Sequence, residues 1–330
     1  MLRYFQVDRE RLYSLEPAAG GGLPQGVVWI DLVEPSQEEE RQLEQALGIH
    51  VPTRDEVSAL QTSSRLSASN GVLYMSAIVA YGREMEPLHT LPVTFVRSGP
   101  LLITIRYGMP ESIDRFVARA QAGEWPLRDA DSILAAVLEV VIDRIADRLE
   151  FIGEDLKRIE GAIFRGRATM TKDRHQPVLS RRIHVLQHAI ERIGIHHRTS
   201  FGLRECLHSL ERLVTFRRTH GADHPRTAQF NAIEGDLKAI ADYDQDLNNS
   251  MDFMVNATVG LIDVQQNKVI YLLSILGMVI TPPVVVASIY GMNFDYMPEL
   301  HWRWGYAWAL GLMLLSAGVP WLVFRLKRWL

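Results

Sequence analysis

Polar and small side chains recur along one face of the segment that leads into the most apolar part of the chain. These residues, at steps of seven, four, three, four and three positions, are Asn256, Asp263, Asn267, Ile270, Ser274 and Gly277. Such steps place side chains on a single stripe of an α-helix. A stripe that begins with carboxylate and amide oxygens and continues into an apolar segment suits a narrow, water-filled path for ions. For Asn256 and Asp263 the alternative is a solvated position on a surface helix, whereas Asn267 adjoins the apolar segment directly.

Two uncharged segments near the C-terminus are long enough to cross a membrane. Residues 269–294 and 304–324 contain 26 and 21 residues without a formal charge, and about 20 helical residues span the hydrocarbon of a bilayer. A buried hairpin in a soluble core is the alternative, which two such runs nine residues apart disfavour. The first segment contains Pro282 and Pro283, which favour a kink in the helix. Two helices cannot enclose a polar path, so an ion path requires several copies of the chain around an axis.

Charged and aromatic residues predict how these segments are oriented. Five of the seven tryptophans lie in the last 30 residues, near the ends of the second segment, and amphipathic rings prefer the level of the lipid headgroups. The tail 325–330 is basic, whereas the connection between the two segments carries Asp295, Glu299 and one arginine. By the positive-inside rule the tail is cytoplasmic and the connection is external. The polar part that precedes the hairpin is then cytoplasmic as well.

Composition excludes several classes of protein. Of the net charge of −4, residues 269–330 contribute +2 (four basic, two acidic) and the rest −6 (31 basic, 37 acidic). A mildly acidic, aromatic-containing chain is neither a disordered tail nor a general nucleic-acid binder. The single cysteine cannot form an intramolecular disulfide, and the charged N-terminus is unlike a secretory signal. No nucleophile, acid–base or glycine-rich phosphate motif stands in a recognisable context. We therefore expect no enzyme and no organic cofactor, with a membrane-anchored sensor or enzyme as the alternative class.

These patterns predict an α+β cytoplasmic domain followed by a long stalk helix and a two-helix transmembrane hairpin. The expected parts are an α/β domain at 1–128, a helical part at 129–226, a stalk helix at 227–268, transmembrane helices at 269–294 and 304–324, an external loop at 295–303 and a basic tail at 325–330. Because no stop signal separates the stalk from the first apolar segment, both belong to one helix of roughly 60 residues, about 90 Å long. Such a helix would couple the cytoplasmic domain mechanically to the bilayer.

Local signals place the elements of the α/β domain. The β-rich runs 27–32, 72–79, 93–96 and 101–106 predict strands, the last two joined by a hairpin turn at 97–100. Ser36 and Glu39 form a capping box that predicts a helix ending near Leu47. From residue 129 onward helical periodicity continues, with breaks near 166–171 and 221–225.

The stalk is strongly acidic. Between residues 231 and 263 one lysine, Lys238, stands among seven acidic residues, which are Glu234, Asp236, Asp242, Asp244, Asp246, Asp252 and Asp263. Helices of this charge repel one another in an oligomer unless cations bridge them. Glu234 and Asp236 are therefore candidate ligands of a regulatory cation, with a simple solvated face as the alternative.

Histidines are concentrated between residues 175 and 224, which hold eight of the 11 in the chain. His184 and His188 lie one helical turn apart, as a zinc pair would. Scattered surface histidines on amphipathic helices are the more common interpretation of such a pattern.

At the end of the first apolar segment, Gly291-Met292-Asn293 is followed by Met297-Pro298-Glu299-Leu300. This pattern resembles the signature of the CorA family of divalent-cation channels, and the resemblance extends to the stretches 263–268, 282–283 and 327–330 and upstream to 29–32 and 52–56. A three-residue motif alone is weak. At the outer end of the penultimate membrane segment, with loop and tail intact, it is specific.

The resemblance implies a homopentamer and a role for each matching residue. Gly291, Met292 and Asn293 would form the external selectivity motif, Asn267 an inner polar ring, Ile270 and Leu273 a hydrophobic constriction, and Asn256, Asp263 and Gly277 further pore lining. The physics is compatible, because Mg²⁺ dehydrates reluctantly and a ring of neutral oxygens can hold it through its water shell. Asp295 and Glu299 would add a negative potential outside.

The implied function is influx of Mg²⁺, also of Co²⁺ and Ni²⁺, through the bacterial inner membrane, with both termini cytoplasmic. An inside-negative potential favours entry of a divalent ion by about 4.6 kcal/mol per 100 mV, so no nucleotide is needed. Cytoplasmic Mg²⁺ would bind between subunits and close the channel, making Mg²⁺ both cargo and regulator. The alternative is a Zn²⁺ transporter of a related branch with proton coupling, against which the Met297–Leu300 loop argues.

Overall fold

The computed structural model describes residues 1–17, 22–58, 66–82, 86–165, 178–220, 227–292 and 297–327. The chain divides into two compact units. The first comprises Met1–Met170 with His188–Val255, and the second comprises Thr171–Gln187 with Asn256–Leu330.

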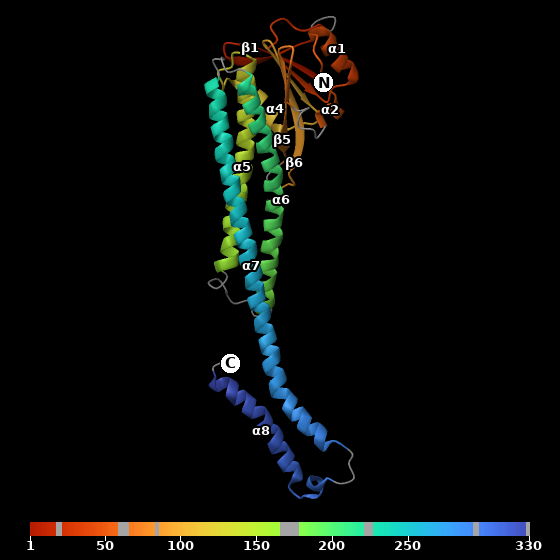
Figure 1. Ribbon diagram of the computed structural model, residues 1–330, viewed down its shortest axis with the longest axis vertical. Coiled ribbons are helices and arrows are strands. Elements are labelled where there is room, and N and C mark those ends of the chain that lie inside the picture. Colours follow the sequence, from red (N-terminus) through yellow and green to blue (C-terminus); the bar gives the residue numbers. More distant parts are fainter. Residues whose placement is uncertain are drawn as a thin grey trace. The chain divides into compact units, whose positions relative to one another are not determined.

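The first unit is built on a seven-stranded sheet, seen at the red and orange end of the chain in Figure 1. The strand order is β2-β1-β3-β7-β6-β5-β4, and only the β3–β7 pair is parallel. The strands are β1 (Leu2–Asp8), β2 (Arg11–Leu15), β3 (Trp29–Val33), β4 (Leu66–Ser69), β5 (Val72–Tyr81), β6 (His89–Ser98) and β7 (Leu101–Arg106). All residues of β3 and β7 are buried, so both faces at the centre of the sheet are covered.

One face of the sheet is apolar and packs against α1 (Gln37–Leu47). Alternate residues of the central strands, among them Ile30 and Ile103, form a core with Leu43 of α1 and with Val51. The expected capping box is confirmed, because Ser36 Oγ accepts from the backbone N–H of Glu39, and the side chain of Glu39 accepts from the backbone N–H of Ser36. A short helix, α2 (Arg54–Ser58), follows α1 in the chain.

The opposite face carries an aromatic cluster under α4 (Glu111–Ala122). Trp29 stacks on Phe5 with ring centroids 4.6 Å apart and meets Phe116 of α4 edge-on at 5.6 Å. All three rings are buried. These contacts fix α4 on the sheet, and neither α4 nor β1 was predicted as a separate element within 1–128.

A buried ionic network completes the contact between α4 and the sheet. Arg106 donates to Asp31 Oδ2 from Nη2 at 3.0 Å and to Oδ1 from Nε at 3.2 Å. Asp31 also accepts from Thr104 at 2.6 Å and from Arg3 Nε at 2.9 Å. Arg3 and Arg106 both reach Asp114 of α4, at 2.9 and 3.1 Å. Because two arginines balance two aspartates, the network is neutral although Asp31 and Arg106 are fully buried.

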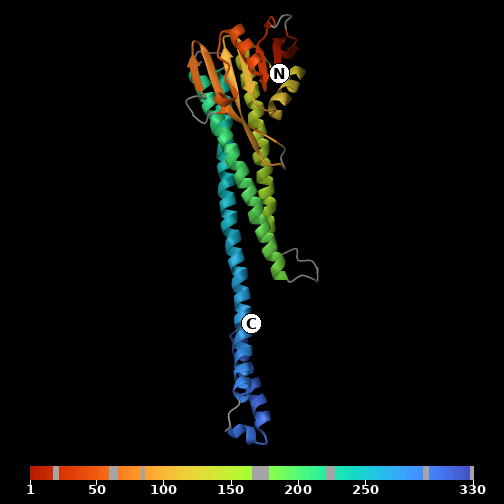
Figure 2. The same ribbon diagram turned by 90° about the vertical axis from the view of Figure 1, so that its right-hand side faces the viewer.

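Three long helices make up the rest of the first unit, in the order α5 (Ala130–Arg165), α6 (Val178–Thr219) and α7, which begins at Thr227. Figures 1 and 2 show them side by side along their common length in this unit. Ion pairs of two buried aspartates join them: Asp155 of α5 with Arg192 and His196 of α6, and Asp244 of α7 with Arg204 of α6. The predicted helix breaks fit these bounds, while 166–171 and 221–225 themselves lie outside the described residues.

The α7 helix is confirmed as one continuous element, Thr227–Tyr290, of 64 residues. The helix runs through Pro282 and Pro283. The second unit also contains a 3₁₀ turn, η1 (Pro298–His301), and α8 (Gly305–Leu326). Two helices are long and apolar enough to cross a membrane, Ala228–Tyr290 within α7 and Gly305–Leu326, which is α8. Residues 269–290 and 305–324 of the two predicted segments lie within these helices, and residues 293–294 lie outside the described residues.

Candidate functional site

Each predicted pore-lining residue of α7 is exposed, as are Leu272 and Leu276 on other sides of the same helix. Ile270 and Leu273 are 60% and 63% exposed. Asn256, Asp263, Asn267 and Gly277 are exposed as well. By contrast, Thr258 and Ile275 of the same helix are buried. The stripe therefore takes little part in packing within the chain, and its oxygens and apolar groups are available to water, ions or other copies.

The polarity of the stripe changes along the helix. A carboxylate and two amides come first, and Ile270 and Leu273 follow within two turns of Asn267. The hydroxyl of Ser274 donates to the carbonyl of Ile270 at 2.9 Å, so it is already satisfied by its own helix. Repeated around an axis, such a helix would present a ring of oxygens next to a constriction that holds no competing polar group.

Gly291 ends α7 in a close backbone approach. Its N–H donates to the carbonyl of Ala287 at 2.9 Å, and the N–H of Met292 donates to the carbonyl of Ile289 at 3.3 Å. A Cβ on Gly291 would lie 3.2 Å from the Ala287 oxygen, so a side chain here crowds the helix end. Met292 is 48% exposed. The carbonyl end of a helix is the negative pole of its dipole, which favours cations.

Several other predicted residues lie beyond what the structure describes. Asn293 and Asp295 are outside the described residues, and so is the side chain of Glu299, whose backbone belongs to η1. Their expected roles in selectivity and in the external potential stay predictions.

The acidic residues of α7 in the first unit differ in how they are neutralised. Glu234 forms an ion pair with Arg218 of α6. Asp244 is 1% exposed and accepts from Arg204 Nε at 2.9 Å and from the Ser200 hydroxyl. Two of the seven acids are therefore paired within the chain. The repulsion between neighbouring α7 helices is smaller than it would be if all seven acids were unpaired.

Asp236 is exposed and has no basic partner among the described residues. It lines a cavity of about 320 Å³ between α5 and α7 together with Asp143 and Glu139 of α5. Burial raises the pKa of Asp143, and the neighbouring charges of Asp147 and Asp236 raise it further against the opposing effect of Arg119. Carboxylates that repel one another in this way favour a bound cation.

Asp143 is a residue that the sequence interpretation missed. The signal that could have found it is the series Glu139, Asp143 and Asp147, three acids spaced one helical turn apart along α5. Nothing in the sequence shows that this series faces Asp236, because the pairing of α5 with α7 is a tertiary contact.

The histidines of the cluster that the structure describes show no metal-binding arrangement. His184 and His188 are exposed, and His196 is buried with its Nε2 2.7 Å from Asp155. Within the described ranges, no group of three or more histidine, cysteine, aspartate or glutamate side chains is placed to hold a metal ion. Two further histidines, His175 and His224, lie outside those ranges.

Comparisons with known proteins cover nearly the whole chain. The family described as "CorA-like Mg2+ transporter protein" matches residues 24–328. The magnesium transport proteins CorA of Salmonella typhimurium and of Escherichia coli K12 are each 29% identical over 331 residues, covering all of both chains.

Solved structures share the fold. The complete CorA magnesium transporter of Methanocaldococcus jannaschii is 18% identical with a TM-score of 0.69, covering 98% of this chain and 97% of that one. The full-length CmaX protein is 16% identical with a TM-score of 0.67, covering 100% and 98%. The cytoplasmic domain of ZntB from Vibrio parahaemolyticus matches 81% of this chain and 96% of its own at 13% identity, with a TM-score of 0.50.

Proposed function

Since the chain belongs to the CorA family of Mg²⁺ transport proteins, we propose that it is the subunit of a homo-oligomeric channel that admits hydrated Mg²⁺ to the cytoplasm. The proposal extends to a pentamer in the bacterial inner membrane, with both termini cytoplasmic, that also passes Co²⁺ and Ni²⁺. It is a transport protein and not an enzyme. The observation that carries the proposal is the exposed stripe of α7, which runs without a break from acidic and amide side chains into a segment apolar enough to cross a membrane.

The proposed path runs along the α7 stripe. From the cytoplasmic side an ion would pass Asn256 and Asp263, then the amides of Asn267, and then the apolar groups of Ile270 and Leu273. The exposure of these side chains supports this role, because a residue buried by packing could not line a water-filled path. Gly277 would leave room for water where the stripe becomes apolar.

Selection would occur at the outer end of α7. Gly291 and Met292 turn the chain out of the helix, and Asn293 would offer an amide oxygen to a hydrated ion. An outer-sphere contact of this kind avoids the cost of stripping water from Mg²⁺. Asp295 and Glu299 would raise the local concentration of cations near the mouth.

The membrane potential would supply the driving force. An inside-negative potential favours inward movement of a divalent ion by about 4.6 kcal/mol per 100 mV. Transport down this gradient requires no chemical step and no organic cofactor.

Cytoplasmic Mg²⁺ would close the channel by binding the carboxylates of α7. Of the two tentative ligands, Asp236 is the better supported, because Glu234 is paired with Arg218. Asp143, which shares a cavity with Asp236, is the partner that supports a hydrated ion between α5 and α7. A bound ion would relieve the repulsion between the two carboxylates and hold the helices together.

Ion flux into liposomes tests the proposal. With the potential set inside-negative by a K⁺ gradient and valinomycin, the purified full chain should carry Mg²⁺ inward, and Asn293→Ala should reduce the flux or its selectivity over Ca²⁺. No Mg²⁺ entry, or an unchanged Asn293→Ala variant, would contradict the proposal. Zn²⁺ flux that requires a proton gradient, with no Mg²⁺ flux, would replace the proposal by a Zn²⁺ transporter. The cytoplasmic domain of ZntB shares the fold of this chain.

Asp143→Asn and Asp236→Asn test the regulatory part. Each variant should require a higher internal Mg²⁺ concentration for closure, because each removes one charge from the cavity. Asp246→Asn, at an exposed acid of the same helix that does not line the cavity, is the matched control, and it should leave the closing concentration unchanged.

A further inference from the structure

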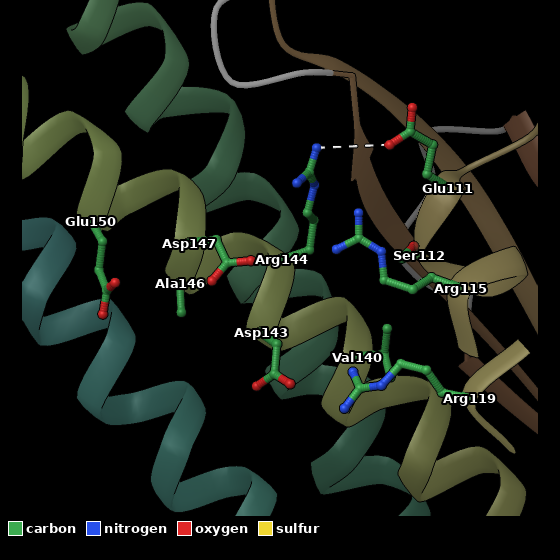
Figure 3. Close-up of a pocket in the computed structure, with 10 residues that line it drawn as sticks. All are labelled: Glu111, Ser112, Arg115, Arg119, Val140, Asp143, Arg144, Ala146, Asp147 and Glu150. Atoms are coloured by element: carbon green, nitrogen blue, oxygen red, sulfur yellow. Dashed lines mark ion pairs between the residues drawn. The ribbon is translucent and has the colours of Figure 1, made fainter. Parts of the chain in front are cut away.

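A second pocket of the first unit lies between α4 and α5 and is not part of the proposed ion path. Its volume is about 340 Å³. Figure 3 shows its lining, in which side chains of opposite charge face one another across the gap between the two helices. The charged and polar members from α4 are Glu111, Ser112, Arg115 and Arg119, and those from α5 are Asp143, Arg144, Asp147 and Glu150.

Ser112 places an unsatisfied polar group against this pocket. The residue is 5% exposed, and its Oγ has no hydrogen-bond partner among the described residues. Buried hydroxyls are nearly always paired, so one that lines a cavity indicates a missing partner. Ser112 is the second residue of α4, and Pro110, which precedes the helix, provides no side-chain cap. The first turn of a helix also carries N–H groups without intrahelical partners, which bind anions.

The arginines of the pocket differ in whether they form ion pairs with other described residues. Arg119 is held by Glu124 at 2.6 Å and by the ring of Trp125. Arg144 donates to the carbonyl of Gly82 at 2.7 Å and lies 3.9 Å from a carboxylate oxygen of Glu111. Arg115 is exposed and forms no ion pair with any described residue. In Figure 3 its side chain extends from α4 toward that of Arg144.

The opposite wall is acidic. Asp143, Asp147 and Glu150 of α5 line the pocket and form no ion pairs with other described residues. A bare anion at Arg115 would therefore face uncompensated negative charge. A metal ion alone fits poorly too, because no trio of ligating side chains within the described ranges could hold one.

A ligand that carries both a negative and a positive group can pair the first with the arginine of one wall and the second with the carboxylates of the other wall. Mg²⁺ in proteins is commonly held by one or two carboxylates together with the phosphate oxygens of a substrate. Arginine recognises phosphate through paired N–H donors, and charge-assisted hydrogen bonds of this kind are strong.

We propose that the α4–α5 pocket binds a Mg²⁺-complexed polyphosphate, such as the triphosphate of a nucleotide. Its phosphate oxygens contact Ser112, the first turn of α4 and Arg115. Its metal reaches Asp147 of α5 through water. The site uses no glycine-rich loop, since its donors come from two separate helices. The site is independent of the ion path, and its test does not require transport.

Binding to the purified full chain in detergent tests this site, with Mg²⁺–ATP as the probe and calorimetry as the readout. Mg²⁺–ATP should bind, and ATP in EDTA should bind at least tenfold more weakly. Magnesium tripolyphosphate should compete with Mg²⁺–ATP, because the phosphates carry the recognition. Arg115→Ala should weaken binding about tenfold or more. Arg158→Ala, which removes an exposed arginine of α5 outside the pocket, should leave binding unchanged.

Ser112→Ala separates a ligand contact from a structural role. The variant should weaken binding several-fold without lowering the melting temperature of the free protein, because the hydroxyl it removes has no partner there. Asp147→Asn should abolish most of the difference in affinity between Mg²⁺–ATP and ATP in EDTA. Three outcomes would overturn the proposal. The first is no binding at millimolar Mg²⁺–ATP, and the second is an affinity of the Arg115→Ala and Ser112→Ala variants equal to that of the unmodified chain. The third is an affinity for ATP that is the same with and without Mg²⁺.

Discussion

Replacing Arg106 by methionine should strongly destabilise the first unit. Arg106 and Asp31 are both fully buried, and the variant loses the donors to both Asp31 oxygens and to Asp114. The four-charge network then carries an uncompensated negative charge in the interior. Removing one partner of a buried ion pair costs about 3–5 kcal/mol. At roughly 2–4 °C per kcal/mol for a domain of this size, the melting temperature should fall by about 6–20 °C.

The design of this experiment rests on charge balance. In the double variant Asp31→Leu/Arg106→Met the network keeps Arg3 and Asp114, which pair with each other at 2.9 Å. The double variant should therefore recover at least half of the loss, because an apolar pair replaces a charged one. Arg41→Met, at an exposed position of α1, is the control and should shift the free energy of unfolding by less than about 0.5 kcal/mol. Thermal unfolding of the full chain, followed by tryptophan fluorescence, measures all three. A double variant at least as unstable as Arg106→Met alone would refute the reasoning.

Three further variants or conditions test other contacts. Gly153→Ala brings a Cβ against the Tyr243 hydroxyl. Because Tyr243 is 41% exposed and its ring can turn aside, thermal unfolding should show a loss of about 1 kcal/mol or less. Gly291→Ala crowds the end of α7 and should lower Mg²⁺ flux several-fold with little change in melting temperature; full flux would remove the requirement for a close backbone approach there. Burial alone would raise the pKa of Asp155, but hydrogen bonds from its two basic partners on α6 outweigh it and lower the pKa. The stability that ionised Asp155 contributes through these hydrogen bonds is present above about pH 4. It is lost as the pH falls through the pKa that Asp155 has in the folded state. A melting temperature that is flat from pH 7 to pH 3 would contradict this.

Local patterns in the sequence predicted the elements whose causes are local. The capping box at Ser36 and Glu39 fixed the start of α1, and the lack of a stop signal after residue 227 predicted that α7 continues into the apolar segment. The residues from Asn256 to Gly277 belong to one continuous helix, as their spacing requires, and their role in lining a pore stays a prediction. In each case the information lies within a few turns of one helix.

Tertiary pairing was not predictable in the same way. Nothing in the sequence indicates that Asp244 is buried against α6 or that Glu234 meets Arg218, so counting charges overestimated the free acidity of α7. Likewise, Asp143 became a candidate only once α5 and α7 were seen to share a cavity. The pocket at Ser112 depends on α4, an element that the sequence interpretation did not separate.

Cysteine accessibility tests the central claim, that one face of α7 lines the ion path. The native Cys206 is fully buried, and burial, with the charge of Glu205, raises the pKa of its thiol to about 12, so it should not react. Asn267→Cys lies on the stripe, and Gln265→Cys on the same helix turns away from it. The account predicts that a positively charged thiol reagent blocks Mg²⁺ flux through the Asn267→Cys channel and leaves the Gln265→Cys and unmodified channels conducting. Equal block at both positions, or block at Gln265→Cys alone, would contradict it.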